Sequence, residues 1–451
     1  MGRLFGTDGV RGVANSELTP ELAFKLGKAG GHVLSKSTKN DKPLFIIGKD
    51  TRLSGDMLED ALSAGITAVG GNVIKVGILP TPAIAYLVRV YNADAGVVIS
   101  ASHNPFEYNG IKFFNDEGFK LDDEIEDDIE DIILRDIDVN SHITGDKLGK
   151  CLDADNDAAQ RYVDFLTETI DIDLTGVKIV MDCANGAAYK VARMTYEKLG
   201  ADITVIGNEP NGININRKCG STHPESLQAE VVRRGALIGL AYDGDADRLI
   251  AVDELGRIID GDKLICICAK MMKDKGLLKD DLVTATVMSN LGFHKYMEAM
   301  GCKVEVTGVG DRYVLESMLK TGCLIGGEQS GHIIFLNHTT TGDGILSSLQ
   351  LMQAVMNSGK KPSELADEIE IFPQVLKNAR VKNENKSKYT KDADIQQAIA
   401  EIEAKMEGQG RVLIRPSGTE PLVRVMLEGQ DVEYITQLAE GLAKLITKRF
   451  G

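Results

Sequence analysis

A weak threefold repeat constrains the fold of this chain more than any other feature of its sequence. Each copy has a short β-branched run, a helix-like segment that ends near a glycine, and a second β-branched run. The copies span residues 44–77, 177–207 and 282–308. Short apolar runs separated by helical segments are typical of βαβ units with largely parallel strands. The repeat therefore predicts three related α/β domains, with a coincidental likeness of ordinary βαβ units as the alternative.

Each copy of the repeat continues into another strand and then into a polar loop. The three loops are Ser100-Ala-Ser-His-Asn-Pro105, Asp243-Gly-Asp-Ala-Asp-Arg248 and Gly327-Glu-Gln-Ser-Gly-His332. Ligands of open α/β sheets bind at the carboxyl ends of strands, so three equivalent loops could face one shared cleft. A coincidental likeness would explain the strands, but not the matching places of the most polar loops.

The C-terminal part of the chain has a different pattern. Helical spacing occurs at residues 395–406 and 434–450, and a strand, a tight loop and a second strand lie between them at 410–427. This pattern predicts a smaller α+β domain. The expected fold class is therefore three related α/β domains with mixed sheets plus a C-terminal α+β domain, with boundaries at 1–150, 151–255, 256–368 and 369–451.

Composition excludes several classes of protein. The net charge of -16 and the lack of a Lys/Arg-rich block argue against a nucleic-acid surface. No run approaches ~18 apolar residues, and the N-terminal segment has no signal-peptide core, so we expect neither a membrane span nor export. Seven cysteines without a C-x-x-C pair indicate reduced thiols and a cytoplasmic location. An anionic ligand would have to be met by locally placed arginines and lysines.

The second polar loop is a candidate metal site. Asp243, Asp245 and Asp247 alternate with two small residues, and Arg248 follows at once. Carboxylates that lie close together repel one another and need a compensating cation. Hard oxygen ligands suit Mg²⁺, which carboxylates usually hold together with a phosphate. The loop lies between two strand-like segments, which favours a metal site over the alternative of a solvated acidic turn.

The first polar loop contains a candidate phosphate carrier. A serine such as Ser102 needs activation or prior modification to act as a nucleophile or a phosphate carrier. The chain has no G-x-S-x-G elbow, and the adjacent His103 cannot easily turn back onto Ser102, so a serine hydrolase is disfavoured. A plain turn with local hydrogen bonds is the alternative. Lys112, ten residues further on, could transfer protons or be a surface charge.

The C-terminal loop Arg415-Pro-Ser-Gly-Thr-Glu-Pro421 is a candidate phosphate cradle. Arg415 offers a bidentate donor, and Ser417 and Thr419 offer hydroxyl groups. Gly418 would let backbone amides approach an anion closely, and Arg424 adds a second positive charge. A tight turn with incidental surface arginines is the alternative.

Two further loops carry polar candidates. Glu328, Ser330 and His332 could hydrogen-bond sugar hydroxyls or an amine, although a loop histidine is often only solvated. His332 could also exchange protons near neutral pH. Near the N-terminus, Gly6-Thr-Asp-Gly-Val-Arg-Gly12 places Arg11 in a glycine-rich turn.

Considered together, five motifs resemble those of the α-D-phosphohexomutase superfamily, in the family's order. They are G-T-D-G-V-R-G, S-A-S-H-N-P, D-G-D-A-D-R, G-E-Q-S-G-H and R-P-S-G-T-E-P. The resemblance extends from Thr7 to Arg424, and no motif position departs from the family's pattern. It implies four domains around a central cleft. Gln329 and the form of the last motif point to the branch of the superfamily that acts on glucosamine phosphates.

The resemblance implies a role for each candidate residue. Ser102 would be carried as a phosphoserine, and one Mg²⁺ per active site would be held by Ser102, Asp243, Asp245 and Asp247. Arg11 and Arg248 would stabilise the transferring phosphoryl group, and Lys112 and His332 would be the general acid and base. Sugar contacts would come from Glu328 and Ser330. The phosphate distant from the reaction would be bound by Arg415, Ser417, Gly418, Thr419 and Arg424.

The resemblance also implies an isomerase that converts glucosamine 6-phosphate to glucosamine 1-phosphate. Glucosamine 1,6-bisphosphate would be the intermediate and activator, and the product would feed UDP-N-acetylglucosamine and peptidoglycan precursors. The implied partner is a small sugar phosphate, and a homodimer is possible. One alternative is a phosphomannomutase/phosphoglucomutase of the same superfamily. The other is a non-catalytic sugar-phosphate-binding protein, which should have lost the serine, a metal aspartate or the lysine.

Overall fold

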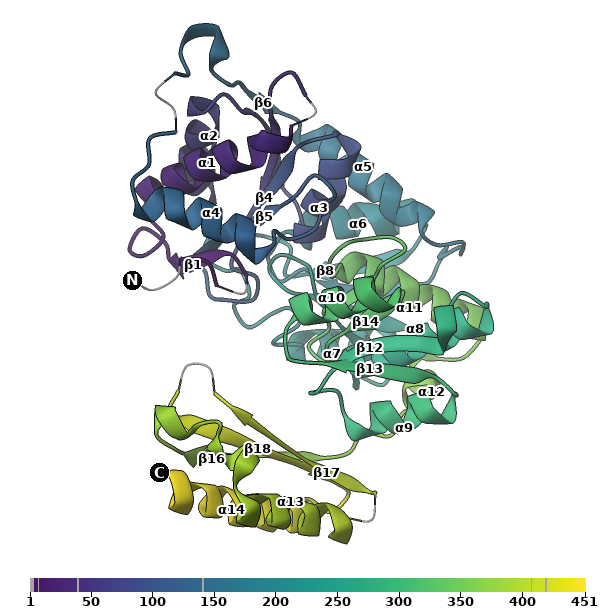
Figure 1. The fold of residues 1–451 in the computed structure, drawn as a ribbon. Coiled ribbons are helices and arrows are strands. Elements are labelled where there is room, and N and C mark those ends of the chain that lie inside the picture. The colour runs from purple at the N-terminus through teal and green to yellow at the C-terminus, as the bar shows by residue number, and fades with distance from the viewer. Residues whose placement is uncertain (1–3, 7, 39, 140–141, 407, 418–419) are drawn as a thin grey trace. The chain divides into compact units, whose positions relative to one another are not determined.

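The computed structural model describes residues 4–6, 8–38, 40–139, 142–406, 408–417 and 420–451. The chain divides into two compact units. The first unit is Met1–Met288 with Cys302–Asp367, and the second is Ser289–Gly301 with Glu368–Gly451. Among the described residues, three sheets belong to the first unit and one to the second (Figure 1).

The first sheet has the strand order β1-β5-β4-β2-β3-β6. Its strands β2, β3, β4 and β6 are parallel, whereas β5 is antiparallel to both of its neighbours. The strands are β1 (Val10–Val13), β2 (Leu44–Lys49), β3 (Asn72–Ile78), β4 (Ala95–Ile99), β5 (Tyr108–Phe114) and β6 (Cys151–Asp153).

Helices cover both faces of this sheet. Figure 1 shows α1 (Pro20–Leu34), α2 (Gly55–Ala68) and α4 (Asp123–Leu134) on one side and α3 (Thr81–Val90) on the other. Thr19 caps the first helix, because its side-chain oxygen accepts the N–H of Leu22, and Pro20 begins the helix, where no backbone donor is needed. Alternate residues of the buried strands pack on the two helical layers, so Phe45 and Ile47 join the core under α1 and α2.

The second and third sheets repeat this plan. The second has the order β11-β10-β9-β7-β8 and the third β13-β12-β14-β15. Their strands are β7 (Lys178–Asp182), β8 (Asp202–Ile206), β9 (Ile238–Tyr242), β10 (Leu249–Asp253), β11 (Ile258–Ile259), β12 (Leu282–Thr286), β13 (Lys303–Thr307), β14 (Ile325–Gly327) and β15 (Ile333–Phe335). The helices are α5 (Asp155–Glu168), α6 (Ala188–Lys198), α7 (Glu225–Arg234), α8 (Gly261–Asp274), α10 (Asp311–Thr321), α11 (Gly344–Ser358) and α12 (Pro362–Ala366).

Three strand orders are equivalent: β3-β2-β4-β5, β8-β7-β9-β10 and β13-β12-β14-β15. In each, the first three strands are parallel and the fourth is antiparallel to the third. The three polar loops are the connections from β4 to β5, from β9 to β10 and from β14 to β15. The predicted fold class of three related α/β domains with mixed sheets is therefore confirmed, and the polar loops lie at equivalent places.

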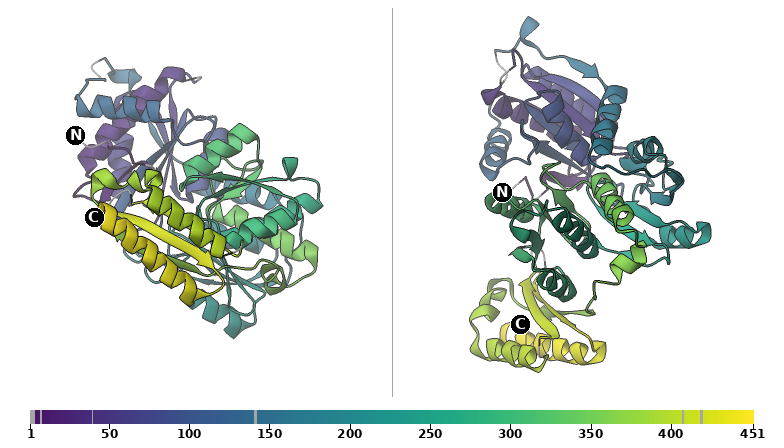
Figure 2. Two further views of the ribbon diagram at one scale, coloured as in Figure 1. Left: turned by 60° about the horizontal axis from the view of Figure 1, so that its bottom comes forward. Right: turned by 90° about the vertical axis from the view of Figure 1, so that its right-hand side faces the viewer.

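The second unit is a small α+β domain, as predicted. Its antiparallel sheet has the order β16-β18-β17, with β16 (Gln374–Arg380), β17 (Gly410–Pro416) and β18 (Leu422–Gly429). Figure 2 shows α13 (Ala393–Lys405) and α14 (Val432–Phe450) on one face of this sheet. The third repeat's crossover helix, α9 (Leu291–Ala299), also belongs to this unit. Its first N–H, on Leu291, donates to the buried carboxylate of Glu428 at 2.9 Å.

Two further findings bear on the sequence analysis. In the part of the chain that the structure describes, no helix is both long and apolar enough to cross a bilayer. Cys151 is exposed, and the other six cysteines are buried with free thiols.

Short 3₁₀ turns occur at Ser35–Ser37, Gly145–Lys147, Lys279–Asp281, Asn383–Asn385 and Lys388–Lys391.

Candidate active site

The three aspartates of the β9–β10 loop converge on one point. Asp243, Asp245 and Asp247 are buried, and one carboxylate oxygen of each lies within 4.8 Å of the others. The glycine between the first two is required sterically, and the alanine that follows adopts an uncommon backbone conformation. A Cβ on Gly244 would lie 2.5 Å from the carbonyl oxygen of Ser102, and Ala246 has a left-handed φ of 57°. The loop therefore turns its carboxylates inward at the carboxyl end of β9.

This carboxylate cluster fits a divalent cation. Asp245 Oδ1 and Asp247 Oδ1 are buried and have no hydrogen-bond partner among the described residues. Burial, followed by repulsion from Asp247 and Asp245, raises the pKa of Asp243 well above its ordinary value. Buried carboxylates of this kind are stabilised when an oxygen-seeking cation supplies the missing charge. The orphaned oxygens are the observation that points to a metal.

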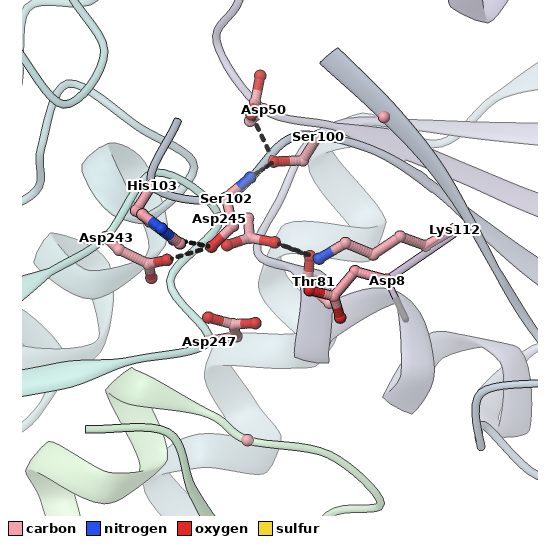
Figure 3. A network of polar contacts seen from close by, with 12 residues as sticks. Asp8, Asp50, Thr81, Ser100, Ser102, His103, Lys112, Asp243, Asp245 and Asp247 are labelled. Carbon is pink, nitrogen blue, oxygen red and sulfur yellow. Dashed lines mark hydrogen bonds and ion pairs between the residues drawn. The ribbon is translucent and has the colours of Figure 1, made fainter. Parts of the chain in front are cut away.

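Ser102 lies against the carboxylate cluster. It follows β4, and its Oγ donates to Asp243 Oδ2 at 2.6 Å (Figure 3). The Nδ1 atom of His103 is 3.4 Å from the same hydroxyl, at the limit of a hydrogen bond. Ser102 is only 2% exposed. The structure thus brings together the serine loop and the metal loop, which belong to different sheets.

Lys112 approaches the cluster from β5. Its Nζ is 3.0 Å from Asp245 Oδ2, and the hydroxyl of Thr81 donates to the same oxygen at 2.7 Å (Figure 3). Burial, the largest influence, lowers the pKa of Lys112, but the attraction of Asp245, Asp8 and Asp247 together outweighs it, so the pKa is raised above its usual value. Burial, the largest influence, raises the pKa of Asp245, but Lys112, Thr81 and Arg11 together lower it by more, so the net direction is downward. Lys112 is therefore a buried ammonium and not a surface charge.

His332 and Arg248 lie on the other side of Asp247. His332 Nδ1 is 3.5 Å from Asp247 Oδ2, and its Nε2 accepts the N–H of Gly342 at 3.1 Å. An acceptor at Nε2 places the proton of the neutral ring on Nδ1, facing Asp247. Burial, the largest influence, lowers the pKa of His332, but Asp247 and Asp311 together raise it by more, so the net direction is upward. Arg248 pairs with Asp247 at 3.8 Å, and its backbone forms a bridge with that of His332.

Arg11 is linked to this region through residues that the sequence analysis did not single out. Its guanidinium pairs with Asp8 at 3.0 Å, while its Nε is buried without a partner in the described part of the chain. Lys120 bridges Asp8 and Asp311, and Asp311 lies 3.7 Å from Nε2 of His332. Asp8 lies within the G-T-D-G-V-R-G motif, but nothing in the sequence marks Lys120 or Asp311.

The β14–β15 loop positions Glu328, Gln329 and Ser330 differently. Glu328 accepts the N–H of Gly310 at 3.1 Å, and Ser330 is exposed. Gln329 donates to Asp260 at 3.3 Å, and Asp260 caps the N-terminus of α8. Gln329 is thus occupied in holding a helix cap, whereas Ser330 is available to a ligand.

The cationic loop of the second unit is described up to Ser417 and from Glu420. Arg415 on β17 and Arg424 on β18 are directly opposite each other in the antiparallel ladder. Burial, followed by repulsion from Arg424, lowers the pKa of Arg415. Ser417 is buried, and its carbonyl accepts a hydrogen bond from Lys386 at 2.8 Å, a third cation that the sequence analysis missed. The predicted ligands Gly418 and Thr419 lie outside the described residues.

Comparison with known proteins agrees with this geometry. Four models of the phosphoglucomutase/phosphomannomutase family match consecutive parts of the chain. Alpha/beta/alpha domain I matches residues 2–139, domain II matches 160–256, domain III matches 260–372, and the C-terminal domain matches 376–445.

Individual relatives cover the whole chain. The phosphoglucosamine mutase of Clostridium novyi is 57% identical over 449 residues, which is 100% of this chain and 99% of the relative. A solved phosphoglucomutase/phosphomannomutase family protein from Burkholderia thailandensis superposes with a TM-score of 0.84 at 23% identity, over 99% of this chain and 98% of that one. The Aspergillus fumigatus N-acetylphosphoglucosamine mutase, solved with GlcNAc-6P and magnesium, gives 0.72 at 17% identity, over 99% and 96%. The chain therefore belongs to the phosphoglucomutase/phosphomannomutase family of isomerases, in its phosphoglucosamine mutase branch.

Proposed function

We propose that the protein interconverts glucosamine 6-phosphate and glucosamine 1-phosphate, with Ser102 as the phosphate carrier and the 1,6-bisphosphate as intermediate. The hydrogen bond from Ser102 Oγ to Asp243 at 2.6 Å supports this most directly. It holds the hydroxyl of a buried serine against three converging carboxylates, which is where a phosphoserine would meet a metal ion. The name and the full-length match of the Clostridium novyi relative support the choice of sugar.

We infer that the cation is Mg²⁺. Asp243, Asp245 and Asp247 would hold it together with an oxygen of the phosphorylated Ser102. When bound, the ion neutralises charge on the transferring phosphoryl group. The all-oxygen donor set and its orphaned atoms fit a hard cation, and magnesium accompanies the sugar phosphate in the Aspergillus fumigatus structure.

The chain's own residues supply the rest of the chemistry. In the first half-reaction, the Ser102 O–P bond breaks and an O–P bond forms at the sugar hydroxyl, whose proton leaves to a base. The second half-reaction returns the other phosphate to Ser102. We assign proton transfer to Lys112 and His332, because both are buried beside the carboxylate cluster. Arg11 and Arg248 would offset the negative charge of the transferring group.

Substrate binding is assigned to two loops. Ser330 is exposed, and Glu328 lies near the cationic Arg248, so the β14–β15 loop would contact the sugar. In the second unit, Arg415, Ser417 and Arg424 would bind the phosphate distant from the reaction, together with Gly418 and Thr419. A dianion would relieve the repulsion between the two opposed guanidinium groups. A cytoplasmic location and a homodimer remain expectations from the sequence.

Two measurements test this proposal. Mass spectrometry of the purified protein should find phosphate on the peptide that contains Ser102. The kcat/KM for glucosamine phosphates should then exceed those for glucose and mannose phosphates by at least about tenfold. A preference for glucose or mannose phosphates would indicate another sugar specificity in the same family. Absence of phosphoserine from a protein that turns over substrate would remove Ser102 as the carrier.

A further inference from the structure

Ser102 adopts a backbone conformation that needs support from its surroundings. Its φ is 49°, in the left-handed region that non-glycine residues seldom occupy. Such a conformation costs about 1–3 kcal/mol and persists only where neighbouring groups hold it. The groups that hold the Ser102 loop are not among the residues assigned above to the substrate or the metal.

Arg52 is the main support of the loop. Its guanidinium is 0% exposed, as is the carboxylate of its partner Asp50, 2.8 Å away. All five N–H donors of a guanidinium are used here. Nε donates to Asp50, and the two terminal nitrogens donate to four carbonyl groups, those of Ser102, Asn104 and Pro105 in the β4–β5 loop and of Tyr108 at the start of β5.

Asp50 completes the support from the amide side of Ser102. Its Oδ2 accepts the hydroxyl of Ser100 at 2.5 Å, and the Ser100 oxygen accepts the N–H of Ser102 at 3.0 Å (Figure 3). The carbonyl of Ser102 is bonded to Arg52 at 2.8 Å. The N–H and the C=O of Ser102 are therefore both fixed by one buried ion pair, which leaves the backbone at this residue little freedom to rotate.

Asn216 holds the same carbonyl from the second α/β region. Its Nδ2 donates to the carbonyl oxygens of Ser102 at 2.8 Å and Asn104 at 3.2 Å. Asn216 is itself in the left-handed region, with φ of 58°, and is 9% exposed. Two donors from segments far apart in the chain thus meet on one carbonyl oxygen, directly behind the reactive side chain.

We propose that Arg52 and Asn216 are positioning residues for phosphoryl transfer at Ser102. They form a clamp that holds the serine backbone while the side chain gains and loses a phosphate, so that Oγ stays directed at the metal loop. A displacement of about 1 Å at a reacting atom can cost about 10²-fold in rate. Lysine would keep the charge of Arg52, but its ammonium group has only three donors in a different geometry. It therefore cannot make the five hydrogen bonds of the planar guanidinium. This clamp rests on the proposed phosphoserine chemistry of Ser102.

The test compares two clamp variants with two control variants at more exposed positions in the full-length protein. Arg52→Lys keeps the charge opposite Asp50, and Asn216→Gly keeps the left-handed backbone without its side-chain donors. Arg257→Lys alters another arginine–aspartate pair of the first unit, and Asn92→Gly alters another asparagine at positive φ. Rapid-quench measurements follow the transfer of labelled phosphate from Ser102 to glucosamine 6-phosphate, and ³¹P NMR follows the phosphoserine resonance.

We expect single-turnover transfer to fall by about 10²-fold in Arg52→Lys and by about tenfold in Asn216→Gly, with KM within about twofold of wild type. The phosphoserine resonance should shift or split in both clamp variants, and the two controls should match wild type. Asn216→Gly keeps the test decisive if Arg52→Lys does not fold.

Transfer within about twofold of wild type in a folded clamp variant, with one unshifted ³¹P resonance, overturns the clamp. A change in KM alone also overturns it, because it would place these residues in substrate binding. A different result would contradict the proposed function itself. A wild-type protein that holds no transferable phosphate on Ser102 would contradict both the function and the clamp before any variant is compared.

Discussion

Charged residues are arranged in opposite ways around Ser102 in the first unit and in the cationic loop of the second unit. Around Ser102, each cation has an anion beside it: Lys112 is 3.0 Å from Asp245, and Arg248 pairs with Asp247. In the described part of the cationic loop, Arg415 and Arg424 face each other, and Arg424 lies 3.5 Å from Glu420. The region around Ser102 therefore pairs these cations with anions, whereas the described part of the cationic loop has an excess of positive charge.

This contrast suggests that one region serves catalysis and the other serves substrate binding. Buried cations that are already paired with anions are positioned before substrate arrives, so they can stabilise the transition state without rearranging. Two opposed guanidinium groups are destabilising until an anion joins them, so that loop gains stability from binding itself. Variants of the first region should therefore lower kcat, and variants of the second should raise KM.

The largest expected effect is that of Ser102→Ala. If Ser102 is the carrier, its loss should reduce turnover by roughly 10³-fold or more while the fold persists, because alanine removes only one hydroxyl. Ser417→Ala, in the cationic loop, is the matched variant and should chiefly raise KM. Steady-state kinetics with glucosamine 6-phosphate and circular dichroism check both. Substantial turnover by a well-folded Ser102→Ala protein would falsify the carrier assignment.

A smaller loss is expected from Asp245→Asn, roughly 10²-fold in kcat. The amide removes one metal ligand and also leaves the buried Lys112 without the anion nearest to it. Activity titrated against Mg²⁺ should show a higher half-saturating concentration as well as a lower plateau. Thr81→Val removes the other donor to Asp245 and should change the titration much less. If the titration and the rate both stay at wild-type values, Asp245 is not a metal ligand.

Arg424→Ala tests the other side of the contrast. It should raise KM for glucosamine 6-phosphate by about tenfold, the usual size of a lost charge-assisted contact, with kcat changed far less. The second unit should not lose stability, since one of two opposed cations is gone. Lys377→Ala is the control, because Lys377 lies on the helix-covered face of the same sheet and pairs with Glu440 of α14. An unaltered KM would place Arg424 outside the phosphate site.

The sequence predicted the fold well where the signal was local. The β-branched runs at residues 44–50, 177–182 and 282–287 became β2, β7 and β12, and the polar loops follow the third strand of each sheet. Chain order alone predicts this, because a repeated order of elements implies a repeated topology. The motif resemblance to the family is likewise confirmed by the four family models and the full-length relatives.

What the sequence could not predict depends on residues far apart in the chain. Lys120 and Asp311 form an ion pair across 191 positions, and neither stands out among the many charged residues of the chain. The helix predicted near 292–300 does form as α9, but it is held by Glu428 of β18. Its sequence specifies a helix, whereas the choice of unit depends on a buried carboxylate more than a hundred residues away.

The smallest expected effect concerns acid stability of the second unit. Burial, followed by repulsion from Arg411, lowers the pKa of His294 from 6.5 to about 4. Because the folded pKa lies below the unfolded one, this stabilisation is complete above pH 6.5 and is lost as the pH falls toward 4. The shift corresponds to at most about 3 kcal/mol, and to about 1–2 kcal/mol once partial solvent exposure is allowed for.

Hydrogen exchange of the full-length protein can isolate this effect. Wild type and His294→Gln are compared at each pH, so that the intrinsic pH dependence of exchange cancels. Protection of β18 peptides should fall between pH 7 and 5 more steeply in wild type than in the variant, because glutamine cannot take up the proton. His338→Gln is the control in the first unit, where burial also lowers the histidine pKa. It should leave β18 unchanged, whereas equal pH dependence in wild type and His294→Gln would mean that the ring is already protonated or solvated in the folded unit.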